Sequence, residues 1–146
     1  MRQGGSASMT GRSPRKKVDA LYWRGRLRVA HAYLEAARQA HVLAEVGQDC
    51  NPVISQIVTS AIAFGDSLTA RRAQVVNQKD HAQAPRLLRD VLGNLLPDGH
   101  ERRYRRILSF KDEVQYGTRQ ATRDEASRLL ADLEEWARRA QELLER

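Results

Sequence analysis

The sequence has little cysteine, few aromatic residues and no long apolar run, and each shortage excludes a class of protein. Cys50 alone cannot form an internal disulfide, and four histidines without cysteine partners give no zinc-binding spacing. No apolar stretch approaches the roughly 20 residues of a membrane span, and the N-terminus lacks the apolar core of a secretory signal. We therefore expect a cytoplasmic protein that does not enter a membrane and binds no metal or cofactor.

Motifs of the common enzyme classes are also missing. The chain has no glycine-rich phosphate loop and no HExxH segment, and its Ser, Thr and Cys residues lie in no known nucleophilic motif. The sequence therefore argues against conventional hydrolases and nucleotide-binding enzymes.

Positive charge is abundant but unevenly distributed. The formal net charge is +7, and residues 1 to 17 contain five basic residues and no acidic one, which leaves 20 basic and 18 acidic residues in the remainder. The first 17 residues combine Gly, Ser, Pro and basic residues without apolar periodicity, which predicts a disordered basic tail. Residues 18 to 146 then form one domain, whose nearly balanced charge is weak evidence for RNA binding.

Apolar residues recur at three- and four-residue spacings in five segments, which predicts an all-α, up-and-down bundle of four to five helices. The expected helices cover about residues 18–46, 52–75, 81–95, 100–116 and 123–144. Asn51, Asp80 and Thr122 are expected as N-caps, and Thr122 forms a capping box with Glu125.

Two charged residues fall inside this apolar pattern. The second expected helix is apolar around nearly its whole circumference, as central helices are, yet it contains Asp66 directly after Gly65. On the fourth helix, Lys111 falls between Ile107 and Tyr104, so it should be at least partly buried. A lysine among apolar side chains must pair with a carboxylate, extend its amine to the surface or lose its proton, and Asp66 is the expected partner. The pair is either a structural ion pair between these helices or a site whose charge acts on a ligand.

The segment HERRYRR, residues 100 to 106, groups four arginines around Tyr104. Arginine beside an aromatic residue suits contacts to phosphates and bases, which makes these arginines candidate RNA-binding residues. They are Arg102, Arg103, Arg105 and Arg106. Alternatively, they form the solvated face of the helix and pair with acids such as Glu134 and Glu135.

Three segments, AIAFGDSLTA, KDHAQAPRLL and ILSFKDEVQYG, contain Asp66, His81, Lys111 and Tyr116. His81 begins a helix, where a capping or surface role is typical. Together the segments resemble the HEPN superfamily, particularly its small bacterial members, over roughly residues 25 to 145. HEPN domains are bundles of four or five helices, commonly homodimers, and many are metal-independent ribonucleases of toxin-antitoxin, CRISPR or phage-defence systems.

The resemblance implies a homodimer with RNA and a cognate protein, such as an antitoxin, as partners. It places Lys111 and Tyr116 where the family has its catalytic arginine and histidine. Because the ordinary pKa of tyrosine is about 10, Tyr116 is a poor general base near neutral pH. The leading hypothesis is an HEPN-like domain that binds RNA, a nucleotide or a protein with weak or no catalysis. Two alternatives are a metal-independent toxin ribonuclease, with Tyr116 or His100 assisting Lys111, and an adaptor whose fifth helix docks a partner.

Overall fold

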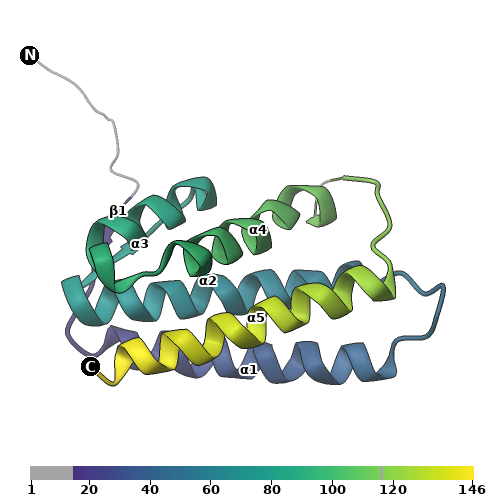
Figure 1. The fold of residues 1–146 in the computed structure, drawn as a ribbon, viewed down its shortest axis with the longest axis horizontal. Coiled ribbons are helices and arrows are strands. Elements are labelled where there is room, and N and C mark those ends of the chain that lie inside the picture. The colour runs from purple at the N-terminus through teal and green to yellow at the C-terminus, as the bar shows by residue number, and fades with distance from the viewer. Residues whose placement is uncertain (1–14, 116) are drawn as a thin grey trace, which may run out of the picture.

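The computed structural model describes residues 15–115 and 117–146. Its helices are α1 (Tyr22–Leu43), α2 (Asn51–Ala73), α3 (Ala84–Leu92), α4 (Asp98–Gln115) and α5 (Arg123–Leu144) (Figure 1). The 3-10 turns η1 (His81–Gln83) and η2 (Gly93–Leu95) flank α3, and a short strand β1 (Arg15–Lys17) pairs with β2 (Val75–Asn77). The predicted all-α bundle is confirmed.

The central helix is α2, which packs against each of the other four helices. Thirteen of its 23 residues are buried, which explains why its sequence shows no single apolar stripe. Ser60, buried among them, donates to the carbonyl oxygen of Ala30 at 2.7 Å. By length and hydropathy α2 could cross a membrane, but 72% of its most apolar window is buried inside the fold, as in the core helix of a globular domain.

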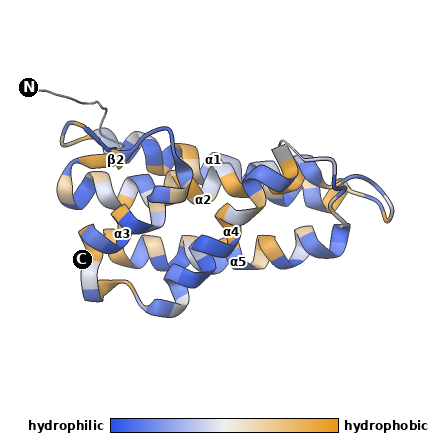
Figure 2. Cartoon of the chain, turned by 90° about the horizontal axis from the view of Figure 1, so that it is seen from above, coloured by the Kyte–Doolittle hydropathy of each residue, from blue (hydrophilic) through white to orange (hydrophobic). Residues whose placement is uncertain are grey.

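The helix α4 approaches α2 closely at Gly65. A Cβ atom at Gly65 would collide with the hydroxyl of Tyr104, which is 1% exposed. Tyr104 stacks on Trp136 of α5 with ring centroids 4.9 Å apart, and the Trp136 indole donates to the carbonyl oxygen of Ala61 at 3.2 Å. These contacts hold α4 and α5 on α2, while hydrophilic residues dominate the visible face of α4 (Figure 2).

Caps fix the loop between α4 and α5. The hydroxyl of Thr122 accepts from the Glu125 amide at 3.1 Å, and the Glu125 carboxylate accepts from the Thr122 amide at 3.0 Å, which confirms the capping box. Asn51 does not cap α2 as predicted. Its side chain instead accepts from the Ala121 amide at 2.7 Å and donates to the Arg119 carbonyl at 3.1 Å. Asn51 therefore ties the start of α2 to the loop that precedes α5.

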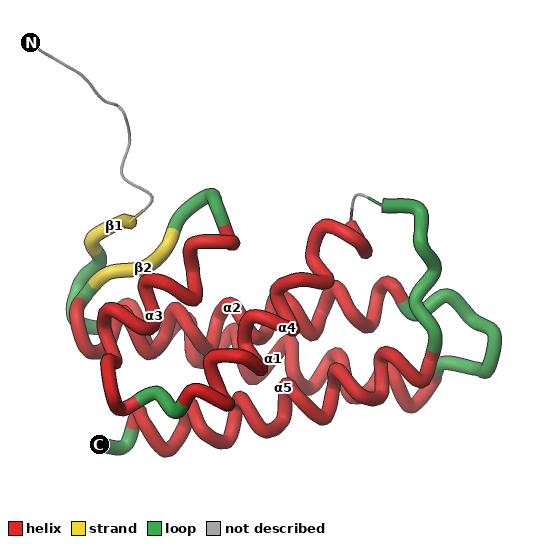
Figure 3. Tube along the Cα trace, turned by 45° about the horizontal axis from the view of Figure 1, so that its top comes forward, coloured by secondary structure: helices red, strands yellow, loops and turns green. Residues whose placement is uncertain are grey.

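The predicted tail boundary at residue 17 is wrong, because residues 15–17 form β1. This strand is antiparallel to β2 and places Lys16 opposite Val76, which is buried (Figure 3). Arg15 also pairs with Asp90 at 2.6 Å. Paired backbone groups and these contacts stabilise a segment whose composition alone predicted disorder. The remainder of the predicted tail, residues 1–14, lies outside the described residues.

Candidate functional site

Asp66 does not pair with Lys111, contrary to the prediction. Its carboxylate lies 3.2 Å from Nη2 of Arg26 on α1. Lys111 follows Tyr104 by seven residues, or about 10 Å along the helix axis, and Tyr104 occupies the space over Gly65. A cation next to Asp66 was predicted correctly, but the structure supplies it from α1. Burial raises the pKa of Asp66 to about 6 against the opposing effect of Arg26.

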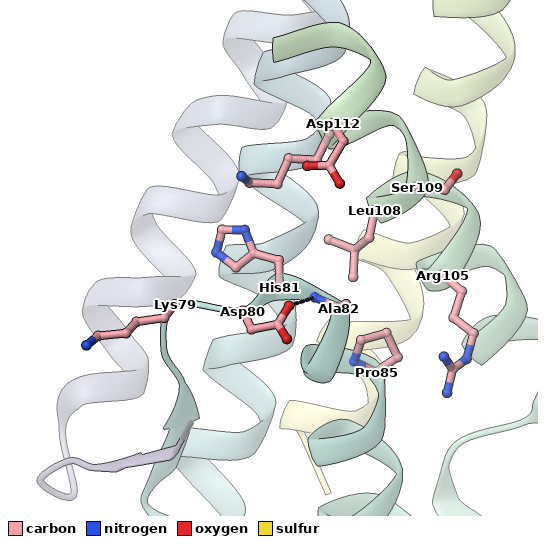
Figure 4. Close-up of a pocket in the computed structure, with 10 residues that line it drawn as sticks. Lys79, Asp80, His81, Ala82, Pro85, Arg105, Leu108, Ser109 and Asp112 are labelled. Atoms are coloured by element: carbon pink, nitrogen blue, oxygen red, sulfur yellow. Dashed lines mark hydrogen bonds between the residues drawn. The ribbon is translucent and has the colours of Figure 1, made fainter. Parts of the chain in front are cut away.

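Lys111 is half-buried, as predicted, and lines a pocket elsewhere on α4. The pocket has a volume of about 370 Å³ and lies between η1, with the loop before it, and the middle and C-terminal part of α4 (Figure 4). Its titratable side chains are Lys79, Asp80, His81, Arg105, Lys111 and Asp112, and the others are Ala82, Pro85, Leu108 and Ser109. The structure therefore brings together three of the predicted site residues, His81, Arg105 and Lys111.

Asp80 positions His81 at the edge of this pocket. The Asp80 carboxylate accepts from the Ala82 amide at 3.0 Å and caps η1, as predicted. The Asp80 carbonyl accepts from the side chain of Asn77 at 2.9 Å, which fixes the turn further. His81 is half-buried, and its Nδ1 atom is buried without a hydrogen-bond partner among the described residues. The hydrogen-bonding capacity of this buried nitrogen is therefore unused among the described residues.

The electrostatics of the pocket favour a neutral His81 and an anionic ligand. Burial lowers the pKa of His81, and the neighbouring Lys111 lowers it further, so the imidazole is uncharged at neutral pH. Three cations, Lys79, Arg105 and Lys111, and two carboxylates, Asp80 and Asp112, line the pocket, and Arg105 also pairs with Glu101 outside it. Lysine and arginine side chains in general form charge-assisted hydrogen bonds with phosphate oxygens, and here they come from two separate elements. The pocket suits a phosphate group, with the His81 nitrogen as an additional polar contact.

Most of the arginines between residues 102 and 106 are used in ion pairs. Arg103 and Arg106 both reach Asp132 of α5, at 3.4 and 3.0 Å. Arg105 pairs with Glu101 at 3.0 Å, while it also lines the pocket. The two contacts to Asp132 link α4 to α5, and all three support the interpretation of this run as a solvated, paired helix face.

The acids predicted to pair with this run are not the ones that do so. Glu134 pairs with Arg38 of α1 at 2.9 Å, and Glu135 pairs with Arg138 within α5 at 3.0 Å. Arg102 is exposed and forms no ion pair with any residue that the structure describes. Of the four arginines, Arg102 alone has no carboxylate partner among the described residues.

His100, one of the two proposed assistants of Lys111, does not lie beside it. Tyr116 lies outside the described residues. His100 precedes Lys111 by 11 residues on the same helix, about 16 Å along its axis, and its Nδ1 lies 3.0 Å from Nη1 of Arg103. The histidine next to Lys111 is His81, which sequence reasoning placed at a helix start without connecting it to α4. The sequence signal that bore on the position of His81 was the Asp80 cap directly before it, which fixes where this turn begins.

No model of a known protein family matches the chain, and no curated protein sequence matches it. Among residues 15–115 and 117–146, no cluster of three or more His, Cys, Asp or Glu side chains could hold a metal ion.

Proposed function

We propose that this chain is an HEPN-like helical domain that binds RNA through phosphate contacts in the His81–Lys111 pocket. One observation carries the proposal. The side chain of His81, whose buried Nδ1 has no hydrogen-bond partner among the described residues, lines this pocket together with the cations Lys79 and Lys111. The pocket volume of about 370 Å³ is within the range of small-ligand sites and accommodates one nucleotide. The resemblance supplies the remainder of the proposal, a role in a bacterial toxin-antitoxin or phage-defence system.

Fluorescence anisotropy with a short labelled RNA tests this site. We expect Lys111→Ala to weaken binding about tenfold, because a charge-assisted hydrogen bond to phosphate is worth about 1.5 kcal/mol. Lys111→Arg keeps the charge and should retain most of the affinity. Arg128→Ala is the matched control, since it removes one positive charge from an exposed pair with Asp124 on α5. Equal losses in Lys111→Ala and Arg128→Ala would refute a specific site and leave only overall charge.

A second function, metal-independent ribonuclease activity, is favoured by the neutral His81 next to Lys111. The imidazole would accept the proton of a ribose 2′-hydroxyl, and the resulting oxygen would attack the adjacent phosphorus. The bond to the 5′-oxygen then breaks, that oxygen takes a proton from water, and a 2′,3′-cyclic phosphate remains. Lys111 would stabilise the negative charge on the phosphate. Cleavage in the presence of EDTA that is lost in His81→Ala would establish this function, and intact RNA would exclude it.

An adaptor that docks a partner on α5 would have to use the polar face of this helix. The apolar residues of α5, among them Leu133 and Leu143, are buried against the chain's own helices. Large exposed apolar side chains lie instead at the end of α1 and just beyond it, where Val42, Leu43 and Val46 are 74%, 79% and 92% exposed. The homodimer and the cognate protein partner stay predictions, and light scattering on the wild type and on Leu43→Asp tests whether this surface mediates them.

A further inference from the structure

We infer a second RNA contact, outside the pocket, at the end of the bundle where α2 ends and α1 begins. We call it the basic end and define it by Lys17, Trp23, Arg24, Arg71 and Arg72. Its ligand is the backbone phosphates of the RNA strand, and this choice of ligand rests on the proposed function, whereas the surface itself does not.

The start of α1 contacts the end of α2 at Trp23, whose ring lies under the guanidinium of Arg71. The amide of Val18 donates to the carbonyl of Gln74 at 3.0 Å, which joins the strand before α1 to the residue after α2. The guanidinium carbon of Arg71 lies 4.9 Å from the centroid of the Trp23 ring, and that of Arg24 lies 5.6 Å away. Such cation-π contacts hold the guanidinium groups in place without neutralising them.

Both arginines of α2 retain unused donors. Arg71 donates its Nε to the carbonyl of Leu144 at 3.0 Å, and Arg72 donates Nη2 to the carbonyl of Leu143 at 3.2 Å. These contacts cap the C-terminus of α5. Because a guanidinium has five N–H donors, several on each side chain are available to a ligand. Neither arginine forms an ion pair with a carboxylate within the described ranges, and both are exposed.

The two arginines also line a recess that suits an anion. It has a volume of about 250 Å³ and is lined by Arg71, Arg72, Leu143 and Arg146. No aspartate or glutamate side chain from the described part of the chain contributes to it. Planar guanidinium groups bind phosphate oxygens in a bidentate manner, so the recess fits a backbone phosphate. Capping of the α5 C-terminus uses one donor from each of Arg71 and Arg72. It does not involve Arg24, whose guanidinium also lies over Trp23.

The basic end and the pocket lie within reach of one strand. Seven residues separate Arg72 from Lys79 of the pocket, which sets a distance of at most about 25 Å between their backbones. A strand of about 12 nucleotides is about 40 Å long when stacked at 3.4 Å per nucleotide. Such a strand can contact both surfaces at once.

The salt dependence of RNA binding tests the inference. For a single strand, each lost phosphate contact reduces the slope of log K against log salt by about 0.7. We expect Arg71→Gln/Arg72→Gln in the full chain to reduce it by about 1.4. The control Arg128→Gln/Arg138→Gln removes two exposed arginines that pair with acids on α5, and should leave the slope unchanged. Glutamine keeps a donor for the α5 carbonyls, and a thermal melt checks that the fold persists.

Tryptophan fluorescence gives an independent reading. Trp136 is fully buried against Tyr104, so an RNA-dependent change in emission reports on Trp23. We expect RNA to change this emission, and Trp23→Phe to abolish the change. Lys111→Ala should weaken binding while the change at saturation persists.

The outcomes separate the inference from the proposed function. An unchanged salt slope in Arg71→Gln/Arg72→Gln, with no response of Trp23, would overturn the basic end even if Lys111→Ala weakens binding. The reverse pattern would overturn the pocket and support the basic end. Stronger binding to phosphatidylserine vesicles than to RNA, lost in the same double variant, would assign the surface to lipid and overturn the inference. A wild type that binds no RNA contradicts both.

Discussion

Replacing Asp66 by Asn tests the balance between burial and ion pairing in the core. The Asp66 side chain is 13% exposed, and its ion-pair contact is the one to Nη2 of Arg26 at 3.2 Å. Loss of hydration exceeds this attraction, so the pKa rises from its ordinary 3.8 to about 6. Between these two pH values the folded protein binds a proton that the unfolded chain does not.

The direction of the pH effect follows from linkage. A folded-state pKa above the unfolded one means that ionised Asp66 reduces stability at neutral pH, and that this cost disappears as the pH falls through 6 toward 4. A difference of about two pKa units corresponds to about 3 kcal/mol at 1.36 kcal/mol per unit. Other carboxylates titrate equally in both proteins. The stability of the wild type relative to Asp66→Asn should therefore rise by up to about 3 kcal/mol between pH 7 and pH 4.

Urea unfolding followed by circular dichroism at pH 7, 6, 5 and 4 measures this difference. Asp124→Asn, which changes a 70% exposed carboxylate on α5, is the control and should show a nearly constant difference from the wild type. A difference between wild type and Asp66→Asn that stays flat, or that falls on acidification, would refute the reasoning. It would mean that Arg26 outweighs burial and that the pKa of Asp66 is not raised.

Three further predictions concern the packing, the capping and the pocket. Gly65→Ala should lower the free energy of unfolding in urea by about 1–2 kcal/mol, because the new methyl group meets the Tyr104 hydroxyl. Adding Tyr104→Phe, which removes that hydroxyl, should recover part of the loss, and no recovery would argue against this contact. Thr122→Ala should cost about 1 kcal/mol in the same assay by removing the α5 cap, with exposed Thr118→Ala, outside the helices, as the control. RNA affinity measured by anisotropy should increase once the pH falls below 6.5, the ordinary pKa of histidine, because the pKa of His81 is lowered and its ring becomes a cation only there. This increase should be absent in His81→Gln.

Local sequence patterns predicted most of the fold. The apolar spacing identified the five helices, and the caps at Asp80 and Thr122 were found because both partners of each cap lie within three residues. Asn51 carries the same capping signal but bonds to residues 68 and 70 positions away. Its role depends on how the two loops meet in space, which no local pattern reveals. The three residues of β1 were missed for the same reason, since their partner strand begins near residue 75.

The candidate site was predicted only in part, because α2 is apolar around its circumference. Such a helix does not reveal which neighbour faces Asp66, and both α1 and α4 offered a cation. The bulk of Tyr104 over Gly65 decides the outcome in favour of Arg26. Lys111 then lies two turns further along α4, where the fold of η1 brings His81 to it. That meeting joins residues 30 positions apart and depends on tertiary packing.

The availability of an arginine to RNA depends on what already neutralises it, more than on how many arginines are adjacent. The run between residues 102 and 106 is the densest in the sequence, yet Asp132 and Glu101 pair with three of its four members. At the basic end, the acceptors for Arg71 and Arg72 are carbonyls at the end of α5, where the helix dipole is equivalent to about half a negative charge. The two positive charges of Arg71 and Arg72 therefore exceed the partial negative charge at the end of α5. For this reason, we expect the arginines of α2 to contribute more to RNA binding than the denser run on α4.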